Sequence, residues 1–130
     1  MTKILIVEDD KEVGKMLERA FRFSGFEVDL VGDGEIALTH LRKSDALPQA
    51  IIMDIIMPNM SGLDLLTKIK EESYLKKIPV MVLTTSFIEE NAEQFLKLGA
   101  DMYLVKIEHK ASDIIDKIRK LIESKNIINN

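Results

Sequence analysis

The sequence predicts an α/β domain in which a doubly wound, five-stranded parallel sheet carries helices on both faces. Short apolar runs alternate five times with longer segments whose apolar residues recur at helical spacing. Three of the runs are continuously apolar, which is typical of strands covered on both faces. Strict alternation requires a crossover after each strand, and right-handed crossovers place helices on both sides of a parallel sheet.

The expected strands are short, and several are rich in β-branched residues. Such side chains pack well on a pleated surface, which favours strands at these positions. The first strand ends in a cluster of acids, and the third ends in a single aspartate. The expected strands are Lys3–Glu8, Glu27–Val31, Ala50–Asp54, Val80–Thr84 and Met102–Val105.

The amphipathic segments between and after the strands are the expected helices. Asp10 is the expected N-cap of the first helix, which ends before Gly25. The fourth helix opens with a capping box at Ser86–Glu89 and closes at Gly99, and the fifth begins near Ser112. The apolar positions of the first helix are Val13, Leu17, Ala20, Phe21 and Phe23, and those of the second are Ile36, Ala37 and Leu41. Those of the third are Leu63, Leu66 and Ile69, and those of the fifth are Ile114, Ile115, Ile118, Leu121 and Ile122.

Composition limits the class of protein. The chain has 130 residues, of which 46% are hydrophobic and 31% are charged, as expected of one domain. We expect this domain to span residues 1–125, with residues 126–130 as a frayed tail. The absence of cysteine excludes disulfides and thiol nucleophiles and favours a reducing, cytoplasmic compartment. No apolar run approaches the ~20 residues that span a bilayer. A formal net charge of −4 argues against a nucleic-acid partner.

Polar residues gather where the expected strands end. Glu8 and Asp9 end the first strand, Asp54 the third and Thr84 the fourth, and Lys106 follows the fifth. In open α/β sheets, binding sites form outside the carboxyl ends of the strands. Clustered carboxylates repel one another unless a cation neutralises them, and Mg²⁺ prefers oxygen ligands. The sequence therefore predicts a magnesium site at this edge of the sheet.

An ordered set of residues resembles the receiver domain of two-component response regulators, over the chain from Lys3 to about Ile122. The set is Glu8-Asp9, Asp54, Met57-Pro58, Gly62, Thr84, Tyr103 and Lys106. The resemblance implies a flavodoxin-like sheet of strand order 2-1-3-4-5 with five helices on its two faces.

The resemblance also implies a role for each acid. Asp54 is the implied phosphoacceptor, which takes a phosphoryl group from a sensor histidine kinase or a histidine phosphotransferase. Mg²⁺ is the implied cofactor, bound by Asp9, Asp54 and the backbone carbonyl of Ile56, with Glu8 acting mainly through metal-bound water. In resembling proteins, polar side chains at the position of Ile56 can place the hydrolytic water, so we expect slow self-dephosphorylation here.

The remaining residues of the set imply a switch. Thr84 and Lys106 are implied to contact the phosphoryl oxygens, and Tyr103 to change rotamer as Thr84 moves. We therefore expect a stand-alone, cytoplasmic signalling domain rather than an enzyme, which switches a surface that binds a downstream effector protein. No direct nucleic-acid contact and no membrane insertion are expected.

Rival functions fit parts of the sequence. A degenerate receiver would bind partners without accepting phosphate. An aspartyl-nucleophile phosphatase of the haloacid dehalogenase type would need a second acid where this chain has Ile56. A flavodoxin-like electron carrier would need a hydroxyl-rich loop in place of Glu8-Asp9-Asp10.

Two positions depart from the resembled pattern and keep the degenerate receiver open. Thr85 stands where the family usually has alanine or glycine, and Ile107 stands where it usually has proline after the lysine. In resembling receivers that lysine–proline bond is cis. A cis bond before an ordinary residue costs ~2.5–4 kcal/mol, so we expect the Lys106–Ile107 bond to be trans.

Overall fold

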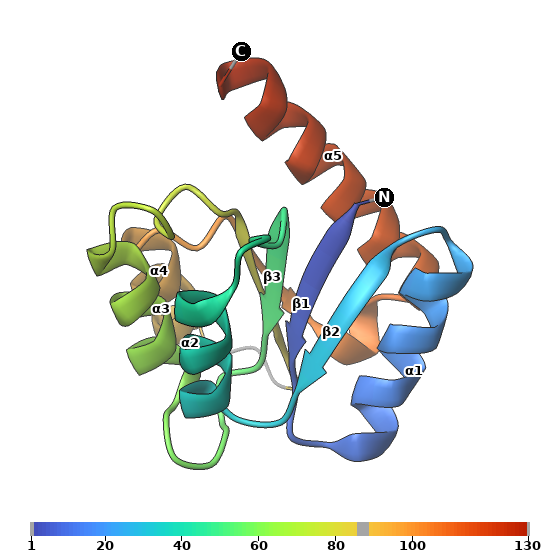
Figure 1. Ribbon diagram of the computed structural model, residues 1–130. Helices are drawn as coiled ribbons and strands as arrows, with labels where there is room; N and C mark the ends of the chain where they lie inside the picture. Colours follow the sequence, from blue (N-terminus) through green and yellow to red (C-terminus); the bar gives the residue numbers. More distant parts are fainter. Residues whose placement is uncertain (1, 86–88, 130) are drawn as a thin grey trace.

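The computed structural model describes residues 2–85 and 89–129. Its strands form one parallel sheet in the order β2-β1-β3-β4-β5, with helices on both faces (Figure 1), so the predicted fold class is confirmed. The strands are β1 (Lys3–Val7), β2 (Glu27–Val31), β3 (Ala50–Met53), β4 (Val80–Thr84) and β5 (Met102–Val105). The helices are α1 (Lys11–Phe23), α2 (Gly34–Lys43), α3 (Gly62–Glu71), α4 (Glu89–Lys97), the 3₁₀ helix η1 (Lys106–Glu108) and α5 (Ala111–Asn129).

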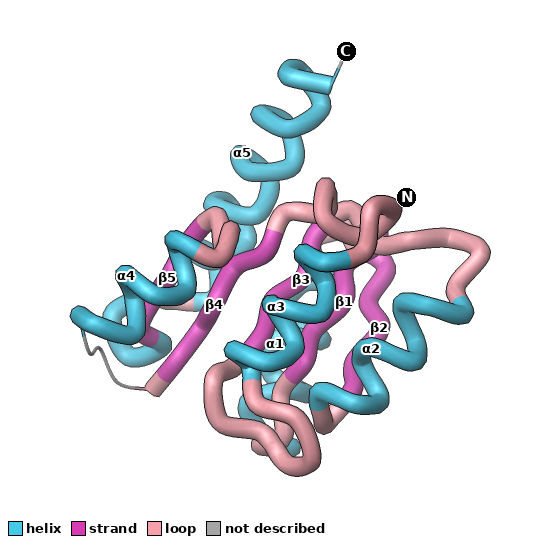
Figure 2. Tube along the Cα trace, turned by 90° about the vertical axis from the view of Figure 1, so that its left-hand side faces the viewer, coloured by secondary structure: helices cyan, strands magenta, loops and turns pink. Residues whose placement is uncertain are grey.

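Two hydrophobic clusters hold the helices against the sheet, one on each face. Alternate residues of β1 belong to opposite clusters, with Leu5 and Val7 in one and Ile4 and Ile6 in the other. Helices α2, α3 and α4 cover the first face, and α1 and α5 cover the second (Figure 2). Because both faces are buried, the central strands are apolar along their length, and polar groups occur where the strands end.

Strands β1 and β3 end one residue earlier than predicted, immediately before the acids. Val7 is the last paired residue of β1, in register with Val31 and Met53. The next backbone amides are still held by the sheet: Glu8 N donates to Val31 O at 2.9 Å, and Asp54 N donates to Val7 O at 3.1 Å. Both acids therefore leave the sheet from well-fixed backbone at its carboxyl edge.

The starts of the first and fifth helices agree with the sequence, and the C-terminal residues differ. Asp10 caps α1 as predicted, since its Oδ1 accepts the N–H groups of Glu12 and Val13 at 3.0 and 3.2 Å. Helix α5 begins at Ala111 and extends beyond the sheet to Asn129 (Figure 1). Residues 126–129, expected as a frayed tail, are thus part of this helix, and the domain boundary at residue 125 stays a prediction.

The segment from β4 to η1 bears on two further expectations. The capping box expected at Ser86–Glu89 falls mainly on residues outside the described part, and α4 begins at Glu89. Peptide bonds among the described residues include no cis bond, so the Lys106–Ile107 bond is trans, as predicted.

None of the described helices combines the length and the hydropathy needed to cross a membrane.

Gly62, the first residue of α3, lies against the backbone that follows β3. Its N–H donates to Ile55 O at 2.7 Å, and a Cβ built on it would lie 2.3 Å from Asp54 O. That distance is far inside van der Waals contact, so only glycine lets α3 start this close to the end of β3. The close approach fixes the path of the chain on leaving Asp54.

We predict that Gly62→Ala lowers the free energy of unfolding by about 1–3 kcal/mol, because the methyl group displaces the Asp54 carbonyl. Alanine is the better helix former, so helix propensity alone would change stability in the opposite direction. Urea denaturation measures the effect. Gly32→Ala is the matched control, since the nearest atom to its Cβ would be Glu8 O at 4.0 Å. Equal stability of the two variants would contradict the steric argument.

Candidate functional site

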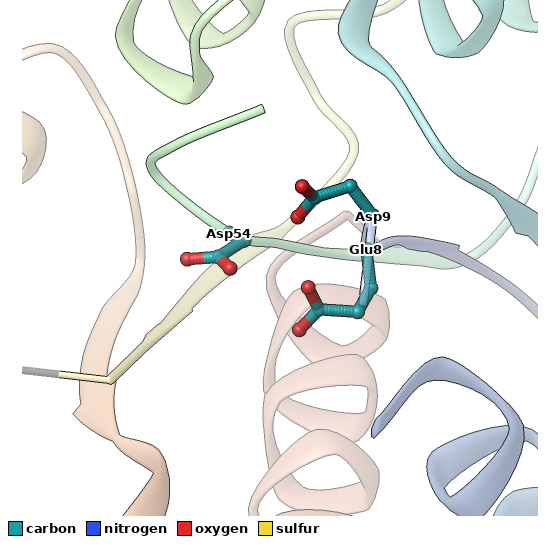
Figure 3. Close-up of side chains that lie close together, drawn as sticks. All are labelled: Glu8, Asp9 and Asp54. Atoms are coloured by element: carbon teal, nitrogen blue, oxygen red, sulfur yellow. The ribbon is translucent and has the colours of Figure 1, made fainter. Parts of the chain in front are cut away.

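Three carboxylates gather at the carboxyl ends of β1 and β3. Glu8, Asp9 and Asp54 each offer one oxygen, and these oxygens lie within 4.8 Å of one another. Figure 3 shows the three side chains grouped around the ends of the two strands. Glu8 is buried, Asp54 is half-buried and Asp9 is exposed, so the group is open to solvent on the Asp9 side. The juxtaposition predicted from the sequence is present.

The ammonium group of Lys106 lies between two of these acids. Its Nζ contacts Glu8 Oε1 and lies 3.2 Å from Asp54 Oδ2. Lys106 is the first residue after β5, and all three side chains are less than 15% exposed. The lysine therefore reaches the acids from the far side of β4, although Ile107 follows it through a trans bond.

Backbone amides hold the other oxygen of each paired carboxylate. Asp54 Oδ1 accepts the N–H of Ile55 at 2.7 Å, and Glu8 Oε2 accepts the N–H of Asp10 at 3.2 Å. Each of the two acids thus has one oxygen on the backbone and one on Lys106. Both carboxylates are fixed in orientation before any ligand binds.

Electrostatics in the site follow from burial and from the number of acids. Burial raises the pKa of Glu8, and the charge of Asp54 raises it further, while Lys106 opposes both. For Lys106, burial alone would lower the pKa, but the hydrogen bond to Glu8 and the charges of Asp54 and Glu8 raise it overall. The lysine is therefore charged, and one cation faces three carboxylates. Oxygen ligands with excess negative charge fit a hard divalent cation such as Mg²⁺.

Thr84 and Tyr103 flank this cluster on β4 and β5. Thr84 is buried at the end of β4 and pairs in register with Val105, the residue before Lys106. Tyr103 is half-buried with its ring 5.9 Å from that of Phe95, and burial together with the charge of Asp54 raises its pKa. Thr84 therefore lies at the edge of the sheet that carries the acids, and Tyr103 lies within β5, near enough for the charge of Asp54 to act on it.

The positions flanking Asp54 and Thr84 differ in exposure. Thr85, the first departure from the resembled pattern, is exposed directly after β4. The side chain of Ile56 is 81% exposed, two residues beyond Asp54.

Sequence analysis did not single out Asp33 or Asn59, whose side chains form a hydrogen bond across 26 residues of sequence. Only the contact reveals them, because aspartate before glycine and asparagine after proline are ordinary cap and turn residues.

We predict that Glu8 makes the metal-free protein less stable as the pH rises. Its folded pKa lies above the ordinary value of 4.5, so its favourable contribution is full below that pH and is lost as the pH rises through the folded pKa. The melting temperature of Glu8→Gln, measured in chelator between about pH 4.5 and pH 7, should therefore fall less steeply than that of the wild type. Glu71→Gln, which alters an exposed acid on α3, should keep the wild-type slope. Identical slopes for Glu8→Gln and the wild type would refute the assignment.

Comparisons with known proteins agree with this geometry. Residues 4–119 match the family model of the response regulator receiver domain, and the chain belongs to this family. The sensory transduction protein RegX3 of Mycolicibacterium smegmatis is 34% identical over 122 residues, covering 94% of this chain and 51% of that protein. The DNA-binding response regulator MtrA of Mycolicibacterium paratuberculosis is 30% identical over 117 residues, with 90% and 49% covered. The chain thus spans about half the length of these curated relatives.

Solved structures show the same fold. A chemotaxis-regulator-like receiver domain of Methanospirillum hungatei superposes with a TM-score of 0.87 at 25% identity, covering 97% of each chain. The receiver domain of the sensor histidine kinase PA1611 of Pseudomonas aeruginosa superposes with a TM-score of 0.83 at 26% identity, covering 94% of this chain and 98% of that one. That structure holds a magnesium ion in its active-site cleft. The family match favours a receiver over the phosphatase and the electron carrier.

Proposed function

We propose that this receiver domain accepts a phosphoryl group on Asp54 in a Mg²⁺-dependent reaction and thereby switches a surface that binds a partner. The donor would be the phosphohistidine of a sensor histidine kinase or of a histidine phosphotransferase. The observation that carries the proposal is the position of Asp54, half-buried beside Glu8 and Asp9 with Lys106 Nζ 3.2 Å from its Oδ2.

The chain's own residues fit the chemistry of phosphoryl transfer. A carboxylate oxygen of Asp54 forms the new P–O bond as the P–N bond of the donor breaks, which gives an acyl phosphate. Negative charge spreads over the phosphoryl oxygens in the transition state, so positioned cations stabilise it. Lys106 supplies one such charge, and the N–H of Ile55 limits rotation of the Asp54 carboxylate.

Mg²⁺ would be held by Asp9, Asp54 and the backbone carbonyl of Ile56, with Glu8 acting mainly through metal-bound water. A bound Mg²⁺ supplies the charge that neutralises the acids and the phosphoryl oxygens. The support is the excess of carboxylates over cations, with three ligand oxygens within 4.8 Å. The exposed Asp9 leaves room for the waters that Mg²⁺ usually retains.

Output would follow from Thr84 and Tyr103. Phosphate on Asp54 would draw the Thr84 hydroxyl toward it, and Tyr103 would change rotamer into the space that Thr84 leaves. Aromatic packing of Tyr103 on Phe95 links this movement to α4. One relative, MtrA, is a DNA-binding regulator about twice as long as the segment that matches this chain. We therefore keep as predictions that this chain acts as a stand-alone protein, that it lies in the cytoplasm and that it makes no contact with nucleic acid.

Incubation of the purified protein with Mg²⁺ and acetyl phosphate tests the phosphoacceptor. We expect acid-labile phosphate on the wild type and none on Asp54→Asn, because the amide has the same shape but cannot attack phosphorus. Asp45→Asn is the control and should label normally, since Asp45 is an exposed loop residue.

Two results would contradict the assignment in different ways. Labelling of Asp54→Asn at the wild-type level would place the phosphate on another residue. A folded wild type that takes up no phosphate would instead support the degenerate receiver.

The two acids of β1 should differ in their effect on metal affinity. We predict that Asp9→Asn weakens Mg²⁺ binding more than Glu8→Gln, because Asp9 would be a direct ligand and Glu8 would act through water. Loss of an outer partner typically costs about tenfold in metal affinity, which sets the effect expected for Glu8→Gln. Isothermal titration with Mg²⁺ measures both. Equal losses, or a larger loss for Glu8→Gln, would overturn the ranking.

A further inference from the structure

Asp33 connects the start of α2 to the segment that follows the phosphoacceptor. Its Oδ1 accepts the N–H of Ile36 at 2.8 Å, which caps α2, and its Oδ2 accepts Asn59 Nδ2 at 2.7 Å. Asp33 is only 7% exposed, and the hydrogen bonds from Ile36 N and from Asn59 lower its pKa. The carboxylate is therefore ionised and buried between a local and a distant donor, and charge-assisted hydrogen bonds of this kind are stronger than neutral ones.

Asn59 has an unusual backbone for a residue with a side chain. Its φ is 67°, and it is the one non-glycine residue with positive φ in the described part of the chain. Asparagine tolerates this left-handed conformation better than most residues do. Asn59 thus combines a backbone that turns the chain with a side chain that binds Asp33.

Two contacts hold the segment 55–61. The start of α2 lies against Met60, because a Cβ on Gly34 would be 2.5 Å from Met60 O. Gly62, which follows the segment, packs against the backbone of Asp54, which precedes it. This segment carries the Ile56 carbonyl and leaves directly from Asp54, so its position sets where both groups lie.

We infer that Asp33 and Asn59 form a positioning pair, which holds segment 55–61 so that the Ile56 carbonyl and the Asp54 carboxylate are arranged for Mg²⁺ binding and phosphoryl transfer. The inference rests on the proposed function of the site. Neither residue touches the three acids through a hydrogen bond among the described residues; both act through the backbone of the segment.

The pair can be broken and rebuilt without removing the cap of α2. In Asp33→Asn, an amide replaces a carboxylate of the same size, and asparagine is an equally good N-cap. With the amide oxygen on the N–H of Ile36, the new NH₂ group meets an acceptor on Asn59 only if the Asn59 amide turns over, and the bond is then neutral instead of charge-assisted. The double variant Asp33→Asn/Asn59→Asp restores one donor and one acceptor with their direction reversed, and aspartate also tolerates positive φ.

Titration with Mg²⁺ and the rate of labelling by acetyl phosphate are the readouts, measured well below the melting temperature of each variant. We expect Asp33→Asn to weaken Mg²⁺ binding by about tenfold and to slow labelling, and we expect the double variant to recover both. Asn59→Gly keeps a backbone suited to positive φ and removes only the side-chain donor, so it should show the same losses even if Asp33→Asn folds poorly.

Asp101→Asn is the control for the loss of a largely buried acid. Asp101 Oδ2 accepts the N–H of Val80 at 2.9 Å at the opposite edge of the sheet, so this variant should lose stability and keep Mg²⁺ affinity. Lower melting temperatures of Asp33→Asn and Asn59→Gly with unchanged Mg²⁺ affinity and labelling would show a purely structural role and overturn the inference. A wild type that binds Mg²⁺ but does not label would overturn the proposed function, while the Mg²⁺ titrations would still decide the positioning role.

Discussion

The contact of one ammonium with two carboxylates, beside a third acid, is the constraint on which this site depends. Lys106, Glu8 and Asp54 are all largely buried, so each charge has lost most of its hydration. A buried ion pair contributes little net stability, because the hydration that its charges lose offsets their attraction. The arrangement is therefore poor as a source of stability and well suited to binding a cation and a phosphoryl group, which change its charge balance.

The sheet makes this concentration of charge possible. Helices cover both faces of β1 and β3, so their interior positions must be apolar, and acids can occur only beyond the last paired residues. The hydrogen bonds Glu8 N to Val31 O and Asp54 N to Val7 O continue the ladder by one step past these residues. The sheet therefore fixes the backbone of Glu8 and of Asp54, at the edge where the carboxyl ends of the parallel strands lie.

Most of the fold and of the site could be predicted from the sequence, because each rests on a local pattern. Continuous apolar runs predicted the strands. Position at the strand ends predicted Glu8, Asp9, Asp54, Thr84 and Lys106 as residues of the site. The trans bond before Ile107 followed from the cost of a non-prolyl cis peptide. Helix α5 continues to Asn129, through residues expected as a frayed tail, because this run has no glycine or proline to stop a helix.

Long-range contacts between ordinary residues could not be predicted. Asp33 before Gly34 has the pattern of a helix cap, and Asn59 after Pro58 has the pattern of a turn; both patterns are correct. The hydrogen bond from the side chain of Asn59 to the second carboxylate oxygen of Asp33 depends on how α2 and segment 55–61 pack together. A single sequence contains no information on that distance.

Borohydride reduction of the protein treated with Mg²⁺ and acetyl phosphate tests the central claim most directly. Reduction converts an aspartyl phosphate to homoserine, and mass spectrometry of the tryptic peptide Ser44–Lys68 then locates it. The account predicts homoserine at position 54, with Asp45 and Asp64 of the same peptide unchanged. Homoserine at position 9 or 10, or a peptide without homoserine from protein that binds Mg²⁺, would contradict it.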